Sequence, residues 1–267
     1  GSRVGGKLLP QYYDEYAQYL MDYCKEYKDT VGAELFAVSP QNEGGFCFPY
    51  NSSCSMPSEF SQEVIAVAKA FAAAKFPVPL TYADMVWWPD WLGQCVSNIC
   101  KDPVADSVCS MLSTHYSGET VSDTWKGDSL CASLARGDKG YRTVNIGTKK
   151  RLWNTEFGGQ FDSWDETIID EGGKTPGGAW TFARNLFMCL RWDFNAVIYW
   201  QLCEPVHSDP KGDHYALFHA NPSTGVITPG PLFNVARQFY RYIRPGAVRV
   251  RGTPRGEPPG RSHRIPA

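Results

Sequence analysis

Two stretches of this sequence end an apolar run with a glutamate. Residues 36–43 read Phe-Ala-Val-Ser-Pro-Gln-Asn-Glu, and residues 151–159 read Arg-Leu-Trp-Asn-Thr-Glu-Phe-Gly-Gly. Each pattern predicts a buried strand that ends at a glutamate, Glu43 or Glu156, before a loop with glycine. If both strands belong to one sheet, the two carboxyl groups can face each other across a cleft. Such a pair suits glycoside hydrolysis, in which one carboxyl group protonates the leaving oxygen and the other attacks or activates water.

The elements that would position these glutamates alternate along the chain. Apolar periodicity predicts helices and strands in turn, namely helices over 11–30, 58–74, 179–191 and 233–243 and strands over 35–39, 78–84, 111–116, 152–156 and 195–202. This alternation predicts an α/β fold with a parallel sheet built of βα units. Five strands end in polar or functional side chains, and a (β/α)8 barrel or a doubly wound sheet has its active site at that end. These side chains are Glu43, Asp84, Tyr116, Glu156 and Gln201.

Composition narrows the class of partner. The chain has 267 residues, 43% hydrophobic, and a formal net charge of −2, which gives no indication of a nucleic-acid partner. No run approaches the roughly 18 apolar residues that span a membrane. The absence of a GxGxxG or Walker loop argues against a nucleotide-dependent enzyme. Aromatic residues make up 14% of the chain, and they either stack on sugar rings or fill the core.

The nine cysteines indicate an oxidising compartment. Cys47 and Cys54 bracket one short loop and Cys95 and Cys100 bracket another, so both pairs are predicted disulfides of a secreted protein, with free buried thiols as the alternative. An odd number leaves at least one cysteine without an intrachain partner, and Cys189, in an apolar helical pattern, is expected to be free. No CxxC pair occurs and the five histidines are scattered, so no metal site is predicted.

Several motifs together resemble glycoside hydrolase family 30, a family of retaining (β/α)8 glycosidases, and in particular its endo-β-1,6-galactanase and glucanase branches. The resemblance covers roughly residues 1–250 and lies in the segments 8–17, 37–43, 153–156, 199–202 and 239–247. It implies that Glu43, which ends strand four, is the acid/base and that Glu156, which ends strand seven, is the nucleophile. It also implies a carbohydrate substrate and no cofactor.

The resemblance suggests further site residues beside the two glutamates. Asn42 would bind the sugar hydroxyl next to the reacting carbon, and Tyr116 would orient Glu156. His115 would bind sugar hydroxyls, with a packed structural histidine as the alternative. Trp200 would form the floor of the subsite or belong to the core.

Three residues at the end of the predicted strand 78–84 and in the loop after it complete this set. Trp87 and Trp88 would line an outer subsite or only cover the loop. Asp84 would contact the substrate or cap a helix.

Two features depart from the family. Gly44 stands where the family commonly has proline, and a glycine is expected to loosen the loop that aims Glu43. Five predicted strands match strands four to eight, so an incomplete barrel is expected over residues 1–250, followed by a disordered or linking Pro/Gly/Arg-rich tail over 251–267. The primary hypothesis is a secreted retaining β-glycosidase acting on galactan or glucan, whose signal peptide is not in this sequence. The alternative is a non-catalytic carbohydrate-binding or truncated product, and the sequence does not give the oligomeric state.

Overall fold

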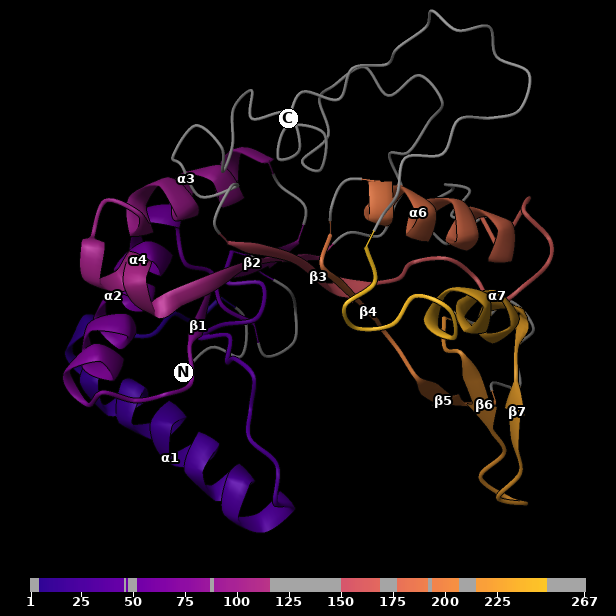
Figure 1. Ribbon diagram of the computed structural model, residues 1–267, viewed down its shortest axis with the longest axis horizontal. Coiled ribbons are helices and arrows are strands. Elements are labelled where there is room, and N and C mark those ends of the chain that lie inside the picture. The colour runs from indigo at the N-terminus through magenta and orange to yellow at the C-terminus, as the bar shows by residue number, and fades with distance from the viewer. Residues whose placement is uncertain are drawn as a thin grey trace, which may run out of the picture.

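The computed structural model describes residues 5–45, 47, 52–86, 89–115, 150–168, 177–191, 194–206 and 215–248. Its centre is a four-stranded sheet in the order β1-β2-β3-β4, and all neighbouring strands are parallel. The strands are β1 (Leu80–Val86), β2 (Cys109–His115), β3 (Arg151–Phe157) and β4 (Ala196–Tyr199). Helices lie on the outer side of this curved sheet (Figure 1). The predicted α/β class is therefore confirmed, and the strands form an incomplete (β/α) barrel.

The described helices include all four that the sequence predicts. Each prediction agrees with its helix to within a few residues, and the last turn of the final predicted helix lies beyond α7. The described helices are η1 (Pro10–Tyr12), α1 (Tyr13–Val31), α2 (Pro57–Ala73), α3 (Pro89–Ile99), α4 (Pro103–Val108), α6 (Ala179–Arg191) and α7 (Pro231–Tyr240). Asp102 caps α4, since its carboxylate accepts hydrogen bonds from two backbone N–H groups of the first turn.

The helix α3 corrects the prediction of a disulfide between Cys95 and Cys100. Cys95 lies within α3 and Cys100 directly follows it, and both thiols are free. Residues five apart on a helix do not lie next to each other on its surface, so the two sulfur atoms are not brought together. Cys95 is buried and donates to the carbonyl of Pro57. The predicted Cys47–Cys54 disulfide is present, and Cys189 is free as expected.

The first predicted strand is the least regular part of the sheet. Residues 35–39 form no continuous ladder, and the segment pairs with β1 only through bridges at Val38–Leu80 and Asn42–Asp84. Between the bridges lies Pro40, which has no N–H to donate. The segment still runs parallel beside β1, because the N–H of Val38 donates to the carbonyl of Pro79 at 3.0 Å. It therefore brings Glu43 to the end of the sheet where the strands finish.

Two apolar clusters hold the helices to the sheet. The first joins α1, α2, α3 and α4 to β1 and β2, and Phe60, Phe71 and Tyr82 are completely buried in it. The second joins α6 and α7 to β3, with Phe157 and Phe182 at its centre. Burying one such side chain contributes about 1.5–3 kcal/mol. Both clusters lie between the helices and the sheet, and they fix the strands whose ends carry the polar side chains.

A second, small sheet lies within residues 203–229. It contains β5 (Cys203–Pro205), β6 (Phe218–Ala220) and β7 (Ile227–Pro229), in that order. The strand β5 pairs parallel with β6, and β6 pairs antiparallel with β7. Strands of three residues are too short to show a period-2 pattern, so no periodic signal marks them in the sequence.

Some expectations fall outside the described residues. They concern Tyr116, Trp87, Trp88 and the tail over 251–267. Among the helices that are described, none has the length and apolar character to cross a membrane.

Candidate active site

Glu43 is held in an uncommon backbone conformation. Its φ is 48°, in the left-handed region that residues other than glycine rarely occupy. The N–H of Glu43 donates to the carbonyl of Asp84 at 2.7 Å, which ties this conformation to the end of β1. Such conformations cost of the order of 1–3 kcal/mol and persist where the surrounding structure fixes them. The backbone therefore aims the Glu43 side chain toward the neighbouring strands.

Gly44 is part of this support. It is buried, and a Cβ atom built on it would lie 2.4 Å from Cδ2 of Phe60 on α2. Its carbonyl accepts a hydrogen bond from the N–H of Ser55 at 2.9 Å. The expectation that this glycine loosens the loop is therefore wrong, because here the missing side chain allows the loop to pack closely on α2.

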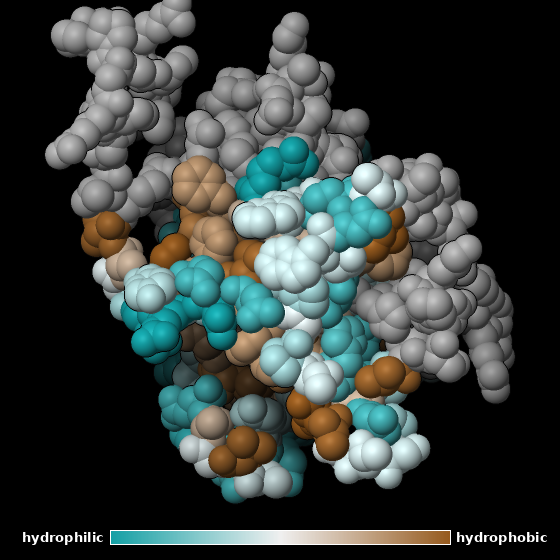
Figure 2. Space-filling view, turned by 90° about the vertical axis from the view of Figure 1, so that its right-hand side faces the viewer, coloured by the Kyte–Doolittle hydropathy of each residue, from teal (hydrophilic) through white to brown (hydrophobic). Residues whose placement is uncertain are grey.

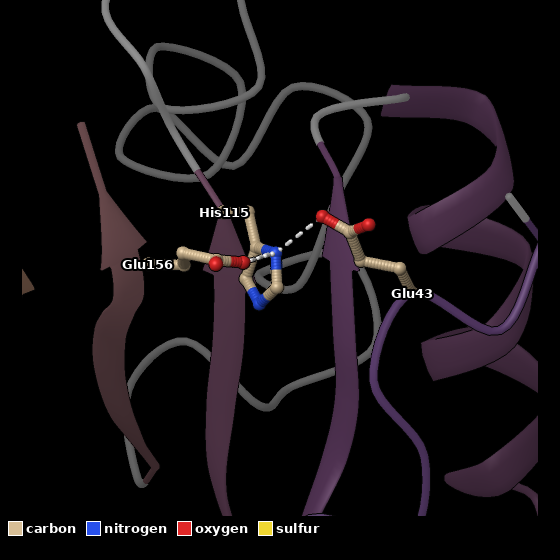
Figure 3. A group of neighbouring side chains, drawn as sticks. All are labelled: Glu43, His115 and Glu156. Atoms are coloured by element: carbon tan, nitrogen blue, oxygen red, sulfur yellow. Dashed lines mark hydrogen bonds and ion pairs between the residues drawn. The ribbon is translucent and has the colours of Figure 1, made fainter. Parts of the chain in front are cut away.

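The end of β2 brings His115 between the two glutamates. His115 and Glu156 are register partners of β2 and β3. Nδ1 of His115 lies 2.7 Å from Oε1 of Glu43 and 2.6 Å from Oε2 of Glu156 (Figure 3). The side chain of His115 is 7% exposed, whereas those of Glu43 and Glu156 are 21% and 29% exposed. The two carboxyl groups thus reach solvent while the imidazole beneath them is buried.

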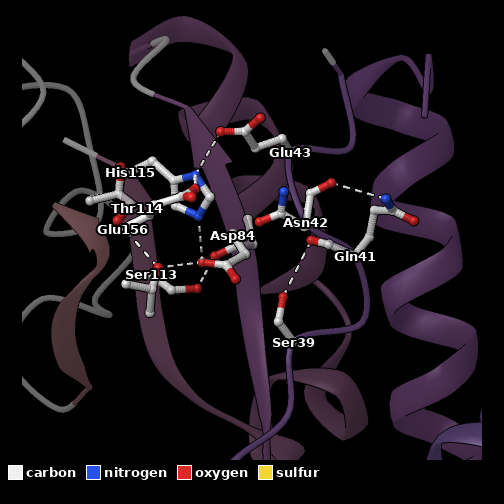
Figure 4. A network of polar contacts seen from close by, with 11 residues as sticks. Ser39, Gln41, Asn42, Glu43, Asp84, Ser113, Thr114, His115 and Glu156 are labelled. Atoms are coloured by element: carbon white, nitrogen blue, oxygen red, sulfur yellow. Dashed lines mark hydrogen bonds and ion pairs between the residues drawn. The ribbon is translucent and has the colours of Figure 1, made fainter. Parts of the chain in front are cut away.

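Asp84 contacts the other nitrogen of the same imidazole. Its Oδ1 lies 3.3 Å from Nε2 of His115, and the hydroxyl of Thr155 donates to the same oxygen (Figure 4). The side chain of Asp84 is 14% exposed. Asp84 therefore supports the imidazole from below and does not cap a helix.

The electrostatics follow from this arrangement. Burial alone would lower the pKa of His115. Hydrogen bonds with Asp84, Glu156 and Glu43 raise this pKa by more than burial lowers it, and the result is about 11. Burial raises the pKa of Asp84, but hydrogen bonds from His115, Thr155 and Ser39 lower it below its usual range. A doubly protonated imidazole can donate from both nitrogens, which matches the carboxylate oxygens found on both sides.

Asn42 and Trp200 are the remaining candidates among the described residues. Asn42 is exposed and precedes Glu43 (Figure 4). Trp200 directly follows β4, is 46% exposed, and joins Gln201 through a cis peptide bond. Its carbonyl oxygen would lie 2.5 Å from a Cβ on Gly158, so only glycine fits there. Trp200 is thus a partly exposed side chain at the strand ends and not a core residue.

The structure also places residues near the centre that the sequence reading did not select. Thr155 and Ser39 both support Asp84. Thr155 carries a sequence signal, because it directly precedes a candidate glutamate at a strand end. Ser39 carries no comparable signal, since its role depends on how the chain bends at Pro40.

A second buried carboxyl–imidazole cluster includes Asp162, which lies in the loop after β3. Nε2 of His219 lies 2.5 Å from Oδ2 of Asp162, and its Nδ1 lies 3.4 Å from Oε1 of Glu204. Asp162 also accepts a hydrogen bond from the N–H of Leu232 in the first turn of α7. Burial raises the pKa of Asp162, and its hydrogen bonds only partly offset this. The cluster joins the loop after β3 to β6 and α7.

The central group also contains the atom types that bind metal ions. Glu43, His115 and Glu156 each offer one such atom, and these three atoms lie within 4.8 Å of one another. Metal binding requires a neutral imidazole. The raised pKa of His115 opposes this, so the geometry fits a protonated imidazole shared by carboxylates better than a metal site.

Comparison with known proteins supports the fold. No protein-family model and no curated protein sequence matches the chain. The crystal structure of SrfJ from Salmonella typhimurium matches 92% of it, with a TM-score of 0.69 and 17% identity. The endo-β1,6-glucanase BT3312 matches 92% with a TM-score of 0.67 and 18% identity, and the catalytic domain of GH30 xylanase C from Talaromyces cellulolyticus matches 92% with 0.63 and 18%.

The chain spans about half the length of these solved structures, 51%, 51% and 52% respectively. The match confirms the fold that the resemblance to glycoside hydrolase family 30 implies. The shared fold is that of the corresponding half of a glycosidase barrel.

The raised pKa of His115 predicts how stability depends on pH. The folded protein retains this proton above the ordinary pKa of 6.5, whereas the unfolded chain releases it. Stability from this group is therefore complete below about pH 6.5 and is lost progressively as the pH rises through about 11. Urea unfolding of the wild type and of His115→Gln should show a difference in unfolding free energy that shrinks across this range. A difference that stays constant with pH would contradict the shared-proton arrangement.

The packing of Gly44 predicts a cost for the smallest possible substitution. Gly44→Ala should displace Phe60 and lower the free energy of unfolding by about 1–3 kcal/mol. Gly6→Ala is the matched control, because a Cβ there meets nothing within 4 Å. Thermal unfolding of both variants measures the effect. Equal melting temperatures for the two variants would show that the loop at Gly44 is not tightly packed.

Proposed function

We propose that this chain carries the catalytic residues of a retaining β-glycoside hydrolase acting on a polysaccharide. The observation that carries the proposal is the close approach of Glu43 and Glu156, whose facing oxygens lie within 4.8 Å. Retaining glycosidases hold their carboxyl groups about 5–5.5 Å apart, and inverting enzymes about 6.5–9.5 Å apart to admit a water molecule. The separation favours a mechanism with a covalent intermediate.

In this mechanism the two glutamates have different roles. A carboxylate oxygen of Glu156 attacks the anomeric carbon while Glu43 protonates the departing glycosidic oxygen, which leaves a glycosyl ester on Glu156. Glu43 then takes a proton from water, and that water attacks the same carbon and frees Glu156. Asn42 would bind the hydroxyl next to the anomeric carbon.

His115 and Asp84 have supporting roles in this proposal. A positive charge on the imidazole stabilises the carboxylate of Glu156, 2.6 Å away, before glycosylation, and that of Glu43, 2.7 Å away, once Glu43 has given up its proton. A sugar bound between the glutamates would replace one of these hydrogen bonds with one to a hydroxyl group. Asp84 contacts Nε2 of His115 and acts on the substrate only through that ring.

The substrate proposed is β-1,6-linked glucan or galactan. Support comes from the sequence resemblance and from the shared fold with an endo-β1,6-glucanase, although a xylanase has that fold as well. Trp200 would stack on the sugar, Trp87 and Trp88 would line an outer subsite, and Tyr116 would orient Glu156. We assign the barrel portion to residues 1–250 and a separate tail to 251–267.

Secretion is proposed on two grounds. The disulfide Cys47–Cys54 suits an oxidising compartment, and a conserved exported protein from Bacteroides fragilis shares the fold.

A second candidate function is carbohydrate binding without turnover. It is favoured by the span of the chain, which covers about half of the structures it matches. The two functions share the residues that bind sugar and differ in whether Glu156 reacts.

Hydrolysis of aryl β-glycosides separates these functions. Galactoside, glucoside and xyloside should be tested with the wild type, Glu156→Gln and Glu43→Gln. Glu156→Gln should abolish turnover, because an amide does not form the glycosyl ester. Glu43→Gln should slow glycosylation less when the leaving group is a good aryl group than when it is a sugar, since a good aryl leaving group needs little protonation. Asp162→Asn, in the second cluster, is a control for buried charge away from the glutamates.

Folded wild-type protein that binds oligosaccharide but hydrolyses none of the glycosides would support the carbohydrate-binding function instead.

A further inference from the structure

Two neighbouring tryptophans are exposed where the chain passes from β3 to α6. Trp164 lies in the loop after β3 and Trp180 in the first turn of α6, and the two residues are 50% and 64% exposed. Their ring centroids lie 5.6 Å apart, with the ring planes tilted by 51°. Within the described part of the chain, the two apolar clusters form without these rings. Single exposed apolar residues are ordinary on a protein surface, but adjacent ones indicate a binding site.

The backbone that carries both tryptophans is fixed by hydrogen bonds. The carboxylate of Glu166 accepts from the N–H groups of Trp180 and Thr181, at 2.9 and 3.1 Å, and from the hydroxyl of Thr181 at 2.5 Å. The N–H of Ala179 donates to the carbonyl of Ser163 at 2.8 Å, which joins the loop after β3 to the start of α6. Little conformational entropy is therefore lost from the backbone when a ligand binds the two rings.

The pair lies at the end of the sheet where the glutamates lie. Trp164 follows Glu156 in the chain, and α6 connects the parallel strands β3 and β4. A helix that connects two parallel strands begins at the end where the first strand finishes, so Trp180 lies at that end too. Figure 2 shows the side of the molecule where α6 and this loop lie, and residues of intermediate hydropathy, a class that includes tryptophan, gather in the middle of this face.

The charges beside the pair restrict the kind of ligand. Residues 160–168 contain Asp162, Asp165 and Glu166 and no lysine or arginine. An acidic surface disfavours nucleic acid, anionic lipid and acidic polysaccharide as ligands. The flat, weakly polar face of an indole ring suits the C–H face of a neutral sugar ring. The chemistry of this surface therefore favours a neutral carbohydrate.

We propose that Trp164 and Trp180 form an outer platform that binds a neutral polysaccharide chain. The proposal rests on the proposed function, because the ligand is the same polymer, and it adds a site for sugar units beyond those between Glu43 and Glu156. The extra rotatable bond of a 1,6-linkage allows successive sugars to adopt the 51° tilt of the two rings. The platform therefore strengthens the binding of long chains and does not contact short ones.

The test compares a disaccharide with an octasaccharide, in both the β-1,6-linked glucose series and the matching galactose series. Each is titrated calorimetrically into the whole chain carrying Glu156→Gln, which prevents turnover. The octasaccharide of one series should bind at least about tenfold more tightly than its disaccharide. In Trp164→Ala/Trp180→Ala, made in the same Glu156→Gln background, this gain with length should disappear while the affinity for the disaccharide stays the same.

Two further variants make the test specific to the platform. Trp164→Phe/Trp180→Phe keeps an aromatic ring at both positions and should retain most of the gain with length. Tyr19→Ala/Tyr23→Ala is the matched control, because it removes two rings of α1 that are 63% and 48% exposed, and it should bind as the parent does. All four positions are exposed, so the substitutions should not prevent folding.

Three results would overturn the proposal. The first is an octasaccharide that binds the parent no more tightly than the disaccharide in both series. The second is a gain with length that survives in Trp164→Ala/Trp180→Ala. The third is a concentration-dependent dimer in sedimentation equilibrium that this variant abolishes, since a second copy of the chain would then cover the rings.

Failure of the proposed function gives a different result. A chain that hydrolyses no aryl glycoside but shows the tryptophan-dependent gain with length would lose the hydrolase assignment and keep the platform. A chain that hydrolyses the glycosides without that gain would keep the assignment and lose the platform.

Discussion

The structure depends on one interaction, the placement of the His115 imidazole among three carboxyl groups. Carboxylates held this close together repel one another strongly in a poorly solvated site. Hydrogen bonds from both imidazole nitrogens, to Glu43 and Glu156 on one side and to Asp84 on the other, offset that repulsion. The same hydrogen bonds raise the pKa of His115. The imidazole thus allows oxygens of Glu43 and Glu156 to lie within 4.8 Å of each other at the strand ends.

The parallel sheet makes this interaction possible. Its strands end on one side, so residues far apart in the sequence meet there, and the register pairs His115 with Glu156. The helices on the other face contribute apolar contacts and no site residues. Glu43 differs from the other site residues because it does not end a regular strand. It comes from the irregular segment before α2, and its position depends on the backbone hydrogen bond to Asp84 and on the packing of Gly44.

Much of this arrangement could be predicted from the sequence. Alternating helical and strand periodicity gave the parallel sheet, and glutamates at strand ends gave the pair. The bridging position of His115 could not be predicted, because it depends on a side-chain rotamer and on register. The short strands β5, β6 and β7 lacked a periodic signal. Cys95 and Cys100 were misread because loop composition suggested a disulfide where the chain forms a helix.

The most direct test of the central claim is the configuration of the first sugar released from a β-glycoside, followed by proton NMR before the anomers equilibrate. A double displacement through Glu156 inverts the anomeric carbon twice, so the account predicts that the β-anomer appears first. Initial formation of the α-anomer would mean that water attacks directly. Glu43 and Glu156 would then not act as the acid/base and nucleophile that their separation indicates.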